Sequence, residues 1–302
     1  MRELKVPGKV MLSGEYAVLH GGTAVMAPVP RYLIIRESNE INSSSLPPVA
    51  SEALNLDVKE IYDFEDQNGR PGLVLDDSQF YSTDSNGTKV KLGLGLSAAE
   101  AVGVIAFRFE RAGLSWQDNR DRIIKYAFEV HSRVQGGLGS GADIAACGFA
   151  HPIKFRKEND RMHIEPIEGG LRKYKIPLKI AWTGKPSNTR DMVAAFEKWA
   201  DAGDKELLQE FIASADELAD AWFQSPLKEL FDKIDAFTSN LRQISEAANL
   251  SLFLPVHDEL EAWARNNGGR AKPTGAGGGD MILLVGDLPA RHPEDTLIPL
   301  ML

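Results

Sequence analysis

The sequence predicts an α+β fold, because strand-like and helix-like segments are partly segregated along the chain. Alternating apolar residues, which are typical of strands, dominate the first third, as in "RYLIIRE" and "GLVLDD". Helical periodicity dominates residues 97–135 and about 191–267, before one last strand-like run, "MILLV". This is not the regular alternation of βαβ units that would predict a doubly wound parallel sheet.

The strands of the first third are predicted from period-two runs that turn residues bound. The runs are "KVMLSGEYAVLHGG", "RYLIIRE" and "GLVLDDSQFYS", and Asp76 and Asp77 in the last run are expected to close a hairpin. The segment "NEINSSSLPPVASE" is polar and contains prolines, so it is expected to be a loop.

Two helices are expected in the middle of the chain. The first should begin at Ser97 and end near Leu114, and the second should start at Ser115, with Asp118 completing a capping-box variant. Their apolar stripes are interpreted as core. After "LKIAW", three or four amphipathic helices are expected between residues 191 and 267.

Length and composition limit the classes of protein. The chain has 302 residues, of which 43% are hydrophobic, and we expect two domains, residues 1–169 and 170–302, with the boundary near Gly169 and Gly170. Acidic residues outnumber Lys plus Arg by 43 to 34, which disfavours nucleic acid and anionic membranes as partners. With one cysteine, Cys147, and no apolar run of membrane-spanning length, we expect a cytoplasmic protein, either a monomer or a homodimer.

Four glycine-bearing loops carry Lys or Arg close to an expected turn. They are "KVPGKVMLSGE", "KVKLGLGLS", "WTGKPSNTR" and "RAKPTGAGGGD". Phosphate binding needs this combination, because glycine lets backbone N–H groups approach the oxygens while lysine adds a mobile full charge. Four such loops in an acidic protein predict a common site for an anionic ligand.

The second of these loops leads into a helix. Gly93 and Gly95 would allow a tight turn, and the free N–H groups at the start of the helix would face a polyphosphate. The Walker sequence is absent, but Gly93, Gly95 and Ala98 satisfy the dinucleotide pattern G-x-G-x-x-[GA]. The acidic residue that this pattern requires about twenty positions later is Asp118, in an expected helix cap, so an NAD-dependent oxidoreductase is a less favoured alternative.

Asp143 follows the glycine turn of "QGGLGSGADIAAC". Two interpretations remain open: the carboxylate caps the next helix, or it is partly buried and positions a lysine or accepts a proton.

Taken together, the motifs resemble those of the GHMP kinase family over nearly the whole chain. "VPGKVMLSGEYAVLHGG" resembles the first motif of that family, "GLGLSAA" the second and "KPTGAGGGD" the third. Tyr16 in "GEYAVL", "GSGADIAA" around Asp143 and "WTGKPSNT" resemble the phosphomevalonate kinase branch. The resemblance implies a two-domain GHMP kinase fold, with an N-terminal ribosomal-protein-like βα domain, a C-terminal ferredoxin-like domain, and ATP and Mg²⁺ bound between them.

The same resemblance implies roles for individual residues, which are carried over by position. Lys9, Lys91 and Asp143 would be catalytic: the lysines would stabilise the transferring phosphoryl group, and Asp143 would hold Lys9 or orient the acceptor. The residues expected to bind ATP are Lys89, Gly93, Leu94, Gly95, Ser97 and Ala98, with Ser97 also contacting magnesium. The residues expected to bind the acceptor substrate are Glu15, Tyr16, Ser140, Gly141, Thr183, Lys185, Thr189, Arg190, Gly275, Ala276 and Gly277.

Two positions depart from the family pattern. Leu96 stands where the second motif usually has its first serine, and Ser132 stands eleven residues before Asp143, where mevalonate kinases have a magnesium-binding Glu. His20, His131 and His151 lack metal-like spacing and are interpreted as surface or core residues.

The cations of "WTGKPSNTRDM" favour an acceptor that already carries a phosphate group. Lys185, Thr189 and Arg190 lie at an expected helix start that could bind phosphate, although a solvent-exposed helix start capped by Asn188 or Thr189 is the alternative. The expected function is ATP-dependent conversion of phosphomevalonate to diphosphomevalonate. The alternatives are mevalonate kinase, another GHMP small-molecule kinase, or a non-catalytic ligand-binding sensor, which Leu96 keeps open.

Overall fold

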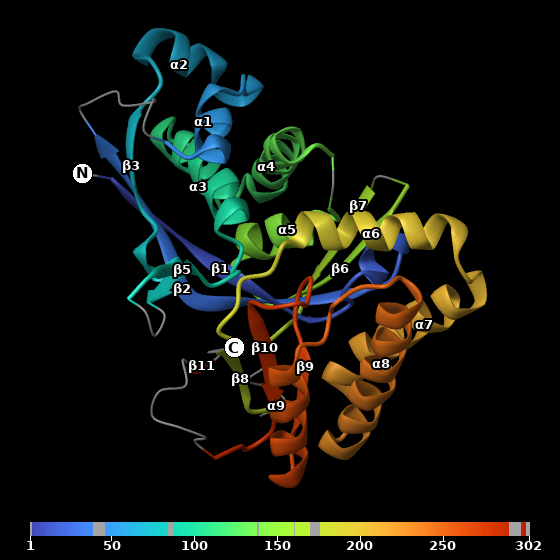
Figure 1. Ribbon diagram of the computed structural model, residues 1–302. Coiled ribbons are helices and arrows are strands. Elements are labelled where there is room, and N and C mark those ends of the chain that lie inside the picture. The colour runs from blue at the N-terminus through green and yellow to red at the C-terminus, as the bar shows by residue number, and fades with distance from the viewer. Residues whose placement is uncertain are drawn as a thin grey trace.

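The computed structural model describes residues 2–38, 46–83, 87–137, 139–159, 161–169, 176–289 and 297–299. Its strands form three antiparallel sheets (Figure 1). The first has the order β1-β2-β6-β7, with β3 also paired to β2, the second has the order β11-β8-β10-β9, and β4 pairs with β5 alone. The strands are β1 (Glu3–Ser13), β2 (Ala24–Ser38), β3 (Gly72–Asp76), β4 (Tyr81–Thr83), β5 (Lys89–Lys91), β6 (Ile153–Glu158), β7 (Arg161–Pro166), β8 (Leu178–Trp182), β9 (Arg270–Pro273), β10 (Met281–Val285) and β11 (Leu297–Pro299).

Helices from the first half of the chain cover one face of the first sheet (Figure 1). The central helix of this layer is α3 (Leu96–Arg111), which lies on β1 and β2 and is almost wholly buried. Its neighbours are α1 (Pro48–Asn55), α4 (Arg120–Gln135) and α5 (Ala142–Phe149), and α2 (Tyr62–Asn68) lies farther out. This packing places the N-terminus of α3 beside β1, where the amide of Lys9 donates to the carbonyl of Leu94 (2.9 Å).

The described part of the second half contributes four helices and the second sheet. The helices are α6 (Thr189–Ala202), α7 (Lys205–Gln224), α8 (Leu227–Ala247) and α9 (Pro255–Asn266). α7 packs along α8, and α9 packs on β9. The four amphipathic helices and the α+β segregation were predicted correctly from the sequence.

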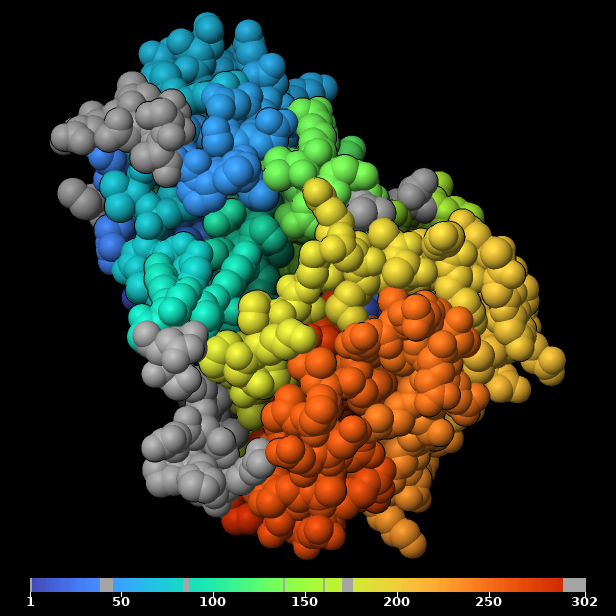
Figure 2. Space-filling view, viewed as in Figure 1, coloured from blue at the N-terminus to red at the C-terminus, as the bar shows by residue number. Residues whose placement is uncertain are grey.

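The two halves of the chain interlock. The indole N–H of Trp222 in α7 donates a hydrogen bond to Ser13 Oγ (3.1 Å), and the Thr274 hydroxyl donates to the Met11 carbonyl (2.6 Å). Figure 2 shows α6, in yellow, between the blue-green first half and the orange second half. The first sheet ends at Pro166 and the second begins at Leu178, but Gly170 lies outside the described residues, so the domain boundary stays a prediction.

Three local predictions were wrong. The segment "NEINSSSLPPVASE" is not a loop throughout, because α1 begins at Pro48 within it, with the prolines before and at its first position. Asp76 and Asp77 do not close a hairpin, because β3 pairs with β2 while β4 pairs with β5. The helix expected at Ser115 begins at Arg120, since the amide of Asn119 donates to the carbonyls of Ser115 and Trp116 and closes a turn there instead.

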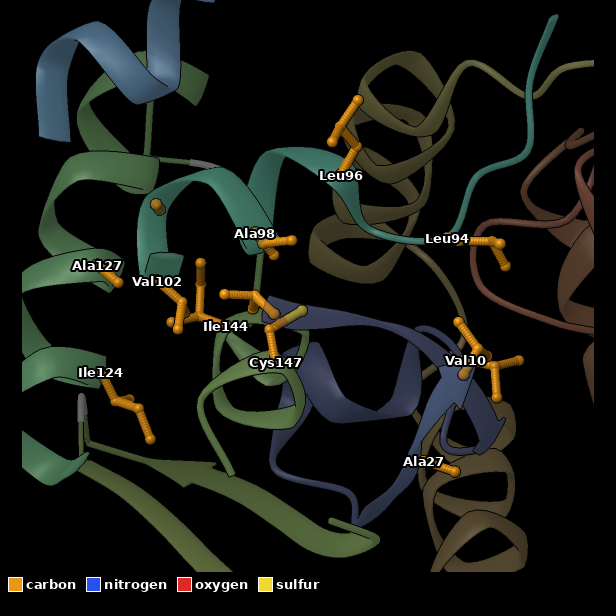
Figure 3. Close-up of a cluster of buried hydrophobic side chains, with 14 of the residues drawn as sticks. Val10, Ala27, Leu94, Leu96, Ala98, Val102, Ile124, Ala127, Ile144 and Cys147 are labelled. Carbon is orange, nitrogen blue, oxygen red and sulfur yellow. The ribbon is translucent and has the colours of Figure 1, made fainter. Parts of the chain in front are cut away.

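Leu96 belongs to the hydrophobic core. It lies in the first turn of α3 and is only 3% exposed, in the same core cluster as Val102 and Ile144 (Figure 3). Cys147 is completely buried in this cluster, and burial raises the pKa of its thiol. Where the family pattern has a serine hydroxyl, this chain therefore has an apolar side chain that packs in the core.

None of the described helices combines the length and the apolar character that crossing a lipid bilayer requires.

Candidate active site

The phosphate loop (residues 93–97) turns the chain into α3. Gly93 and Gly95 have φ angles of +70° and +78°, in the left-handed region that glycine adopts without strain. The first hydrogen bond of the helix runs from the amide of Ala99 to the carbonyl of Gly95, so the amides of residues 96–98 lie ahead of the helical ladder. Such an N-terminus can bind an anion.

Each of these two glycines accommodates a charged side chain from a distant segment. A Cβ on Gly95 would lie 2.7 Å from the Cγ and Cε atoms of Lys9, and a Cβ on Gly93 would overlap the carboxyl group of Asp280. The amide of Lys9 also donates to the carbonyl of Leu94 (2.9 Å). The loop therefore needs glycine for close approach as well as for backbone conformation.

Lys9 and Asp143 form an ion pair beside the phosphate loop. Lys9 Nζ lies 3.2 Å from Asp143 Oδ2, with the two side chains 10% and 40% exposed. Burial alone would lower the pKa of Lys9, but the charge of Asp143 and the hydrogen bond to it raise the pKa above its ordinary value. The helix cap of α5 is Gly141, so the interpretation of Asp143 as the cap was wrong, and the structure places it against a lysine.

One cavity of about 160 Å³ touches all four glycine-bearing loops. Its wall includes residues from β1 and the turn after it, from the phosphate loop, from the α4–α5 turn, from the start of α6 and from the β9–β10 loop. The residues predicted for the site that line it are Lys9, Glu15, Tyr16, Gly93, Leu94, Ser140, Gly141, Asp143, Thr189, Gly275 and Ala276. The four loops that composition singled out thus converge in space.

Other predicted residues lie around this cavity without lining it. Lys89 and Lys91 are exposed on β5, and Lys89 Nζ sits 3.9 Å from the ring centroid of Tyr81. Thr183 donates its hydroxyl hydrogen bond to the carbonyls of Asp280 and Lys185, and the Gly277 carbonyl accepts from Ser187. Gly95 and Ser97 are half-buried and Ala98 is fully buried.

Residues 183–190, named the acceptor loop after the role expected for them from the sequence, lead into α6. Asn188 caps this helix, because its side-chain oxygen accepts from the amide of Asp191 (3.4 Å). Lys185, Thr189 and Arg190 are exposed, and Thr189 reaches the cavity. The helix start is therefore capped by Asn188, and of these three residues only Thr189 lines the cavity.

Glu15 and Tyr16 form the floor of the cavity and connect to the third motif. Glu15 Oε1 lies 2.5 Å from Lys272 Nζ, and these side chains are 1% and 0% exposed. Burial raises the pKa of Glu15 and lowers that of Lys272, while the charge of each partner counteracts the shift of the other. The Tyr16 hydroxyl donates to the carbonyl of Ala276 (2.5 Å), so Glu15 is tied to β9 and Tyr16 to the β9–β10 loop.

Glu15 also presents an unpaired acceptor. Its Oε2 atom is buried and has no hydrogen-bond partner within the described parts of the chain. Since the residue lines the cavity, a ligand hydroxyl could satisfy this oxygen.

His131 belongs to the site, although it was interpreted from the sequence as a surface or core residue. Its Nε2 atom lies 3.2 Å from Ser97 Oγ and 3.0 Å from the side-chain nitrogen, Nε2, of Gln135. Burial and the charges of Lys9 and Lys91 hold its pKa below the ordinary value, against the opposing effect of Asp143. The missed signal was the spacing of His131 and Gln135, which puts both on one face of α4.

Asp280 and Lys272 were also missed. Both stand in the third motif, but Asp280 reads as a turn residue after three glycines, and Lys272 reads as an ordinary lysine of a strand. Burial raises the pKa of Asp280, against the charges of Lys9 and Lys91. Asp143 and Asp280, whose charges act on Lys9, thus both follow glycine-rich segments of the sequence.

The described residues contain no group of three or more His, Cys, Asp or Glu side chains that could hold a metal ion by themselves. The Ser97 hydroxyl and the carboxylates near Lys9 are oxygen donors of the type that Mg²⁺ prefers. Magnesium in phosphoryl-transfer sites is usually held by one or two such groups together with the phosphates of the nucleotide. This donor set fits a magnesium ion that enters with its nucleotide.

Glu100, near the start of α3, predicts a pH-dependent stability. It is 5% exposed, and burial raises its pKa from 4.5 to about 7, with Lys91 opposing and Asp77 adding to this shift. Because the folded pKa exceeds the unfolded one, ionisation destabilises the fold as the pH rises from about 4.5 to 7. We expect Glu100→Gln to be more stable than the wild type by about 2 kcal/mol at pH 8 and equally stable at pH 4.5.

Urea unfolding of both proteins at the two pH values would measure this difference. The exposed Glu246→Gln variant is the control for the loss of one charge. A difference between wild type and Glu100→Gln that is the same at both pH values would contradict the prediction.

The chain is similar over most of its length to two kinds of small-molecule kinase. It is 25% identical to the phosphomevalonate kinase of Streptomyces sp. (strain CL190), covering 95% of this chain and 90% of that protein. It is also 25% identical to the mevalonate kinase of Thermococcus gammatolerans, covering 90% of this chain and 85% of that protein. No protein-family model matches the chain.

The fold is also similar to that of a solved structure of Streptococcus pneumoniae phosphomevalonate kinase in complex with phosphomevalonate and AMPPNP. The TM-score is 0.76 at 18% identity, and the match covers 96% of this chain and 93% of that one. The likeness therefore extends through both halves of the chain.

Proposed function

Since the chain belongs to the GHMP kinase family and is a small-molecule kinase, we propose that it transfers the γ-phosphoryl group of ATP to phosphomevalonate, giving diphosphomevalonate and ADP. The single observation that carries the proposal is the convergence of the four glycine-bearing loops on one cavity. The phosphate loop offers a place for the triphosphate, and the acceptor loop, of which Thr189 lines the cavity, carries the exposed cations Lys185 and Arg190. Relatives named mevalonate kinase keep mevalonate as the second candidate acceptor.

In the proposed reaction, an oxygen of the acceptor's phosphate attacks the γ-phosphorus of ATP. The bond to the oxygen bridging the β- and γ-phosphorus atoms breaks, and ADP leaves with that electron pair. A phosphate acceptor has already lost most of its second proton near neutral pH, so no strong general base is required. Lys9 is placed to neutralise charge on the transferring group, and Asp143 keeps Lys9 charged and directed toward the cavity.

Ser97 and the amides of residues 96–98 would hold the triphosphate and its magnesium ion, which would supply further charge neutralisation when bound. His131 and Gln135 orient the Ser97 hydroxyl. On the acceptor side, the unpaired Glu15 Oε2 would accept a hydrogen bond from a hydroxyl group of the substrate.

The test is ADP release by the purified protein with ATP and magnesium. Mevalonate, phosphomevalonate and diphosphomevalonate would be offered in parallel. The proposal expects the highest kcat/KM with phosphomevalonate. A preference for mevalonate would replace it with the second candidate, and no release with any of the three would contradict both.

Arg190→Ala should separate acceptor binding from nucleotide binding. Arg190 is exposed at the start of α6, beside Thr189, which lines the cavity. If its guanidinium contacts the acceptor's phosphate, the variant should raise the KM for phosphomevalonate about tenfold or more and change the KM for ATP less than about twofold. Lys198→Ala, which removes another exposed cation from the same helix, is the control. Equal losses for the two substrates would sink this assignment.

A further inference from the structure

Asp280 connects the phosphate loop to the acceptor loop through its side chain. On one side, its carboxyl group packs on Gly93 so closely that only glycine fits there. On the other side, its Oδ1 atom accepts a hydrogen bond from the amide of Ser187 (3.1 Å). The carboxyl group also faces the charges of Lys9 and Lys91, so it lies where the nucleotide's phosphates and the acceptor would meet.

The main chain at Asp280 is tied to the same loop. Its carbonyl accepts from the amide and the hydroxyl of Thr183 (2.9 and 3.0 Å), and its amide donates to the carbonyl of Lys185 (2.7 Å). These hydrogen bonds therefore make the position of residues 183–187 depend on Asp280 as well as on α6. A displacement of the Asp280 side chain at Gly93 would be passed to the segment that leads into Thr189 and Arg190.

The backbone of Asp280 has an unusual conformation. Its φ angle is +52°, in the left-handed region that residues other than glycine rarely adopt. Strained backbone of this kind persists where the surrounding contacts determine it, and it clusters at functional sites. Here the contacts on both faces of the carboxyl group account for the conformation.

We propose that Asp280 is a positioning residue that holds the acceptor loop in register with the phosphate loop, so that nucleotide binding at residues 93–97 and acceptor binding at residues 185–190 are coupled through this side chain. The proposal rests on the proposed function for the identity of the acceptor. The contact between Asp280 and Ser187, however, can be followed without any acceptor.

Two substitutions separate the contribution of the Asp280 hydrogen bond and packing from the contribution of its negative charge. Asp280→Ala removes the Ser187 hydrogen bond and the packing on Gly93 but keeps the main-chain bonds to Thr183 and Lys185, so the fold should survive. Asp280→Asn keeps an oxygen that can accept from Ser187 and removes the charge. Asp216→Ala is the matched control, because Asp216 Oδ1 accepts from the amide of Thr23 (2.7 Å) and joins the two halves away from the cavity.

The first readout is hydrogen–deuterium exchange at the amide of Ser187, with and without AMPPNP and magnesium. In the wild type, the nucleotide analogue should slow this exchange about fivefold or more, because it fixes the phosphate loop under Asp280. In Asp280→Ala the exchange should be faster and should not respond to the analogue. Asp280→Asn and Asp216→Ala should respond like the wild type.

The second readout is steady-state kinetics. Because coupling is reciprocal, Asp280→Ala should raise the acceptor KM at saturating nucleotide and the nucleotide KM at saturating acceptor by a similar factor, about tenfold, while AMPPNP binding without acceptor stays within about twofold. Asp280→Asn should restore most of the loss. Unchanged Ser187 exchange in Asp280→Ala, or an equal rise of the acceptor KM in Asp216→Ala, would overturn the proposal. If the wild type does not phosphorylate phosphomevalonate, the proposed function fails, while the exchange measurement still decides the role of Asp280.

Discussion

Lys9→Met should lower kcat about 10³-fold while leaving nucleotide binding within a few-fold of the wild type. The methionine keeps an apolar chain of similar length over Gly95, so the packing on the phosphate loop is preserved. What is lost is the ammonium group 3.2 Å from Asp143, which would stabilise charge on the transferring phosphoryl group. Because the Asp143 side chain is 40% exposed, water can solvate it after the substitution, and the fold should remain intact.

Steady-state kinetics and calorimetric titration with AMPPNP would separate the two effects. Lys5→Met is the matched control, since Lys5 lies on the same strand but pairs with Glu3 away from the cavity. A loss of less than about tenfold in Lys9→Met would move the catalytic cation to Lys91.

Asp143→Asn tests the other half of the same pair. The substitution keeps the shape of the side chain but removes the charge that raises the pKa of Lys9. We expect kcat to fall about 10²-fold with substrate binding largely kept. The alkaline limb of the kcat profile should also move to lower pH, because Lys9 would lose its proton more readily. An unchanged turnover would leave Asp143 with a structural role in the first turn of α5.

Lys272→Met should destabilise the fold by about 3–5 kcal/mol, because it leaves the Glu15 carboxylate buried without a partner. The loss should be largest above neutral pH. A buried, unpaired glutamate has a folded pKa above its unfolded value, so its penalty falls as the pH drops below the folded pKa and the group takes up a proton. Urea unfolding at pH 8 and pH 5 would show a larger loss at pH 8, with an unchanged m-value.

The double variant Glu15→Gln with Lys272→Met should recover part of the loss, since no charge then remains buried. Lys233→Met is the control, because its pair with Glu217 (2.7 Å) is solvent-exposed and should contribute less than about 1 kcal/mol. Equal effects of the two single lysine substitutions would contradict the role of burial.

The sequence predicts the fold class, the main helices and the meeting of the glycine-bearing loops, because these follow from periodicity and from local turn chemistry. The start of α4 was misplaced because Ser115 and Asp118 have the residue types of a capping box, whereas the chain closes a turn at Asn119 instead. The periodicity of the sequence does not show where α4 starts, because the start depends on the tertiary packing of residues such as Trp116, which is 8% exposed.

The residues missed at the site share one property: their roles depend on partners far along the chain. Asp280 acts on Gly93 and Ser187, and Lys272 acts on Glu15. Neither contact leaves a local signature, since a carboxylate after glycines and a lysine in a strand are ordinary surface features. His131 was set aside because only metal-like spacing was considered, whereas its contacts are with a hydroxyl and an amide.

The contact between Glu15 and Lys272 also orders events during synthesis of the chain on a ribosome. Lys9 and Asp143 both lie in the first half, so they can pair once α5 has emerged. Glu15 must wait for β9, which is made when almost all of the chain has been translated. A nascent chain that stops before β9 would lack both Lys272, the partner of Glu15, and Asp280, which packs on Gly93, so the first half alone would leave the cavity without one of its walls.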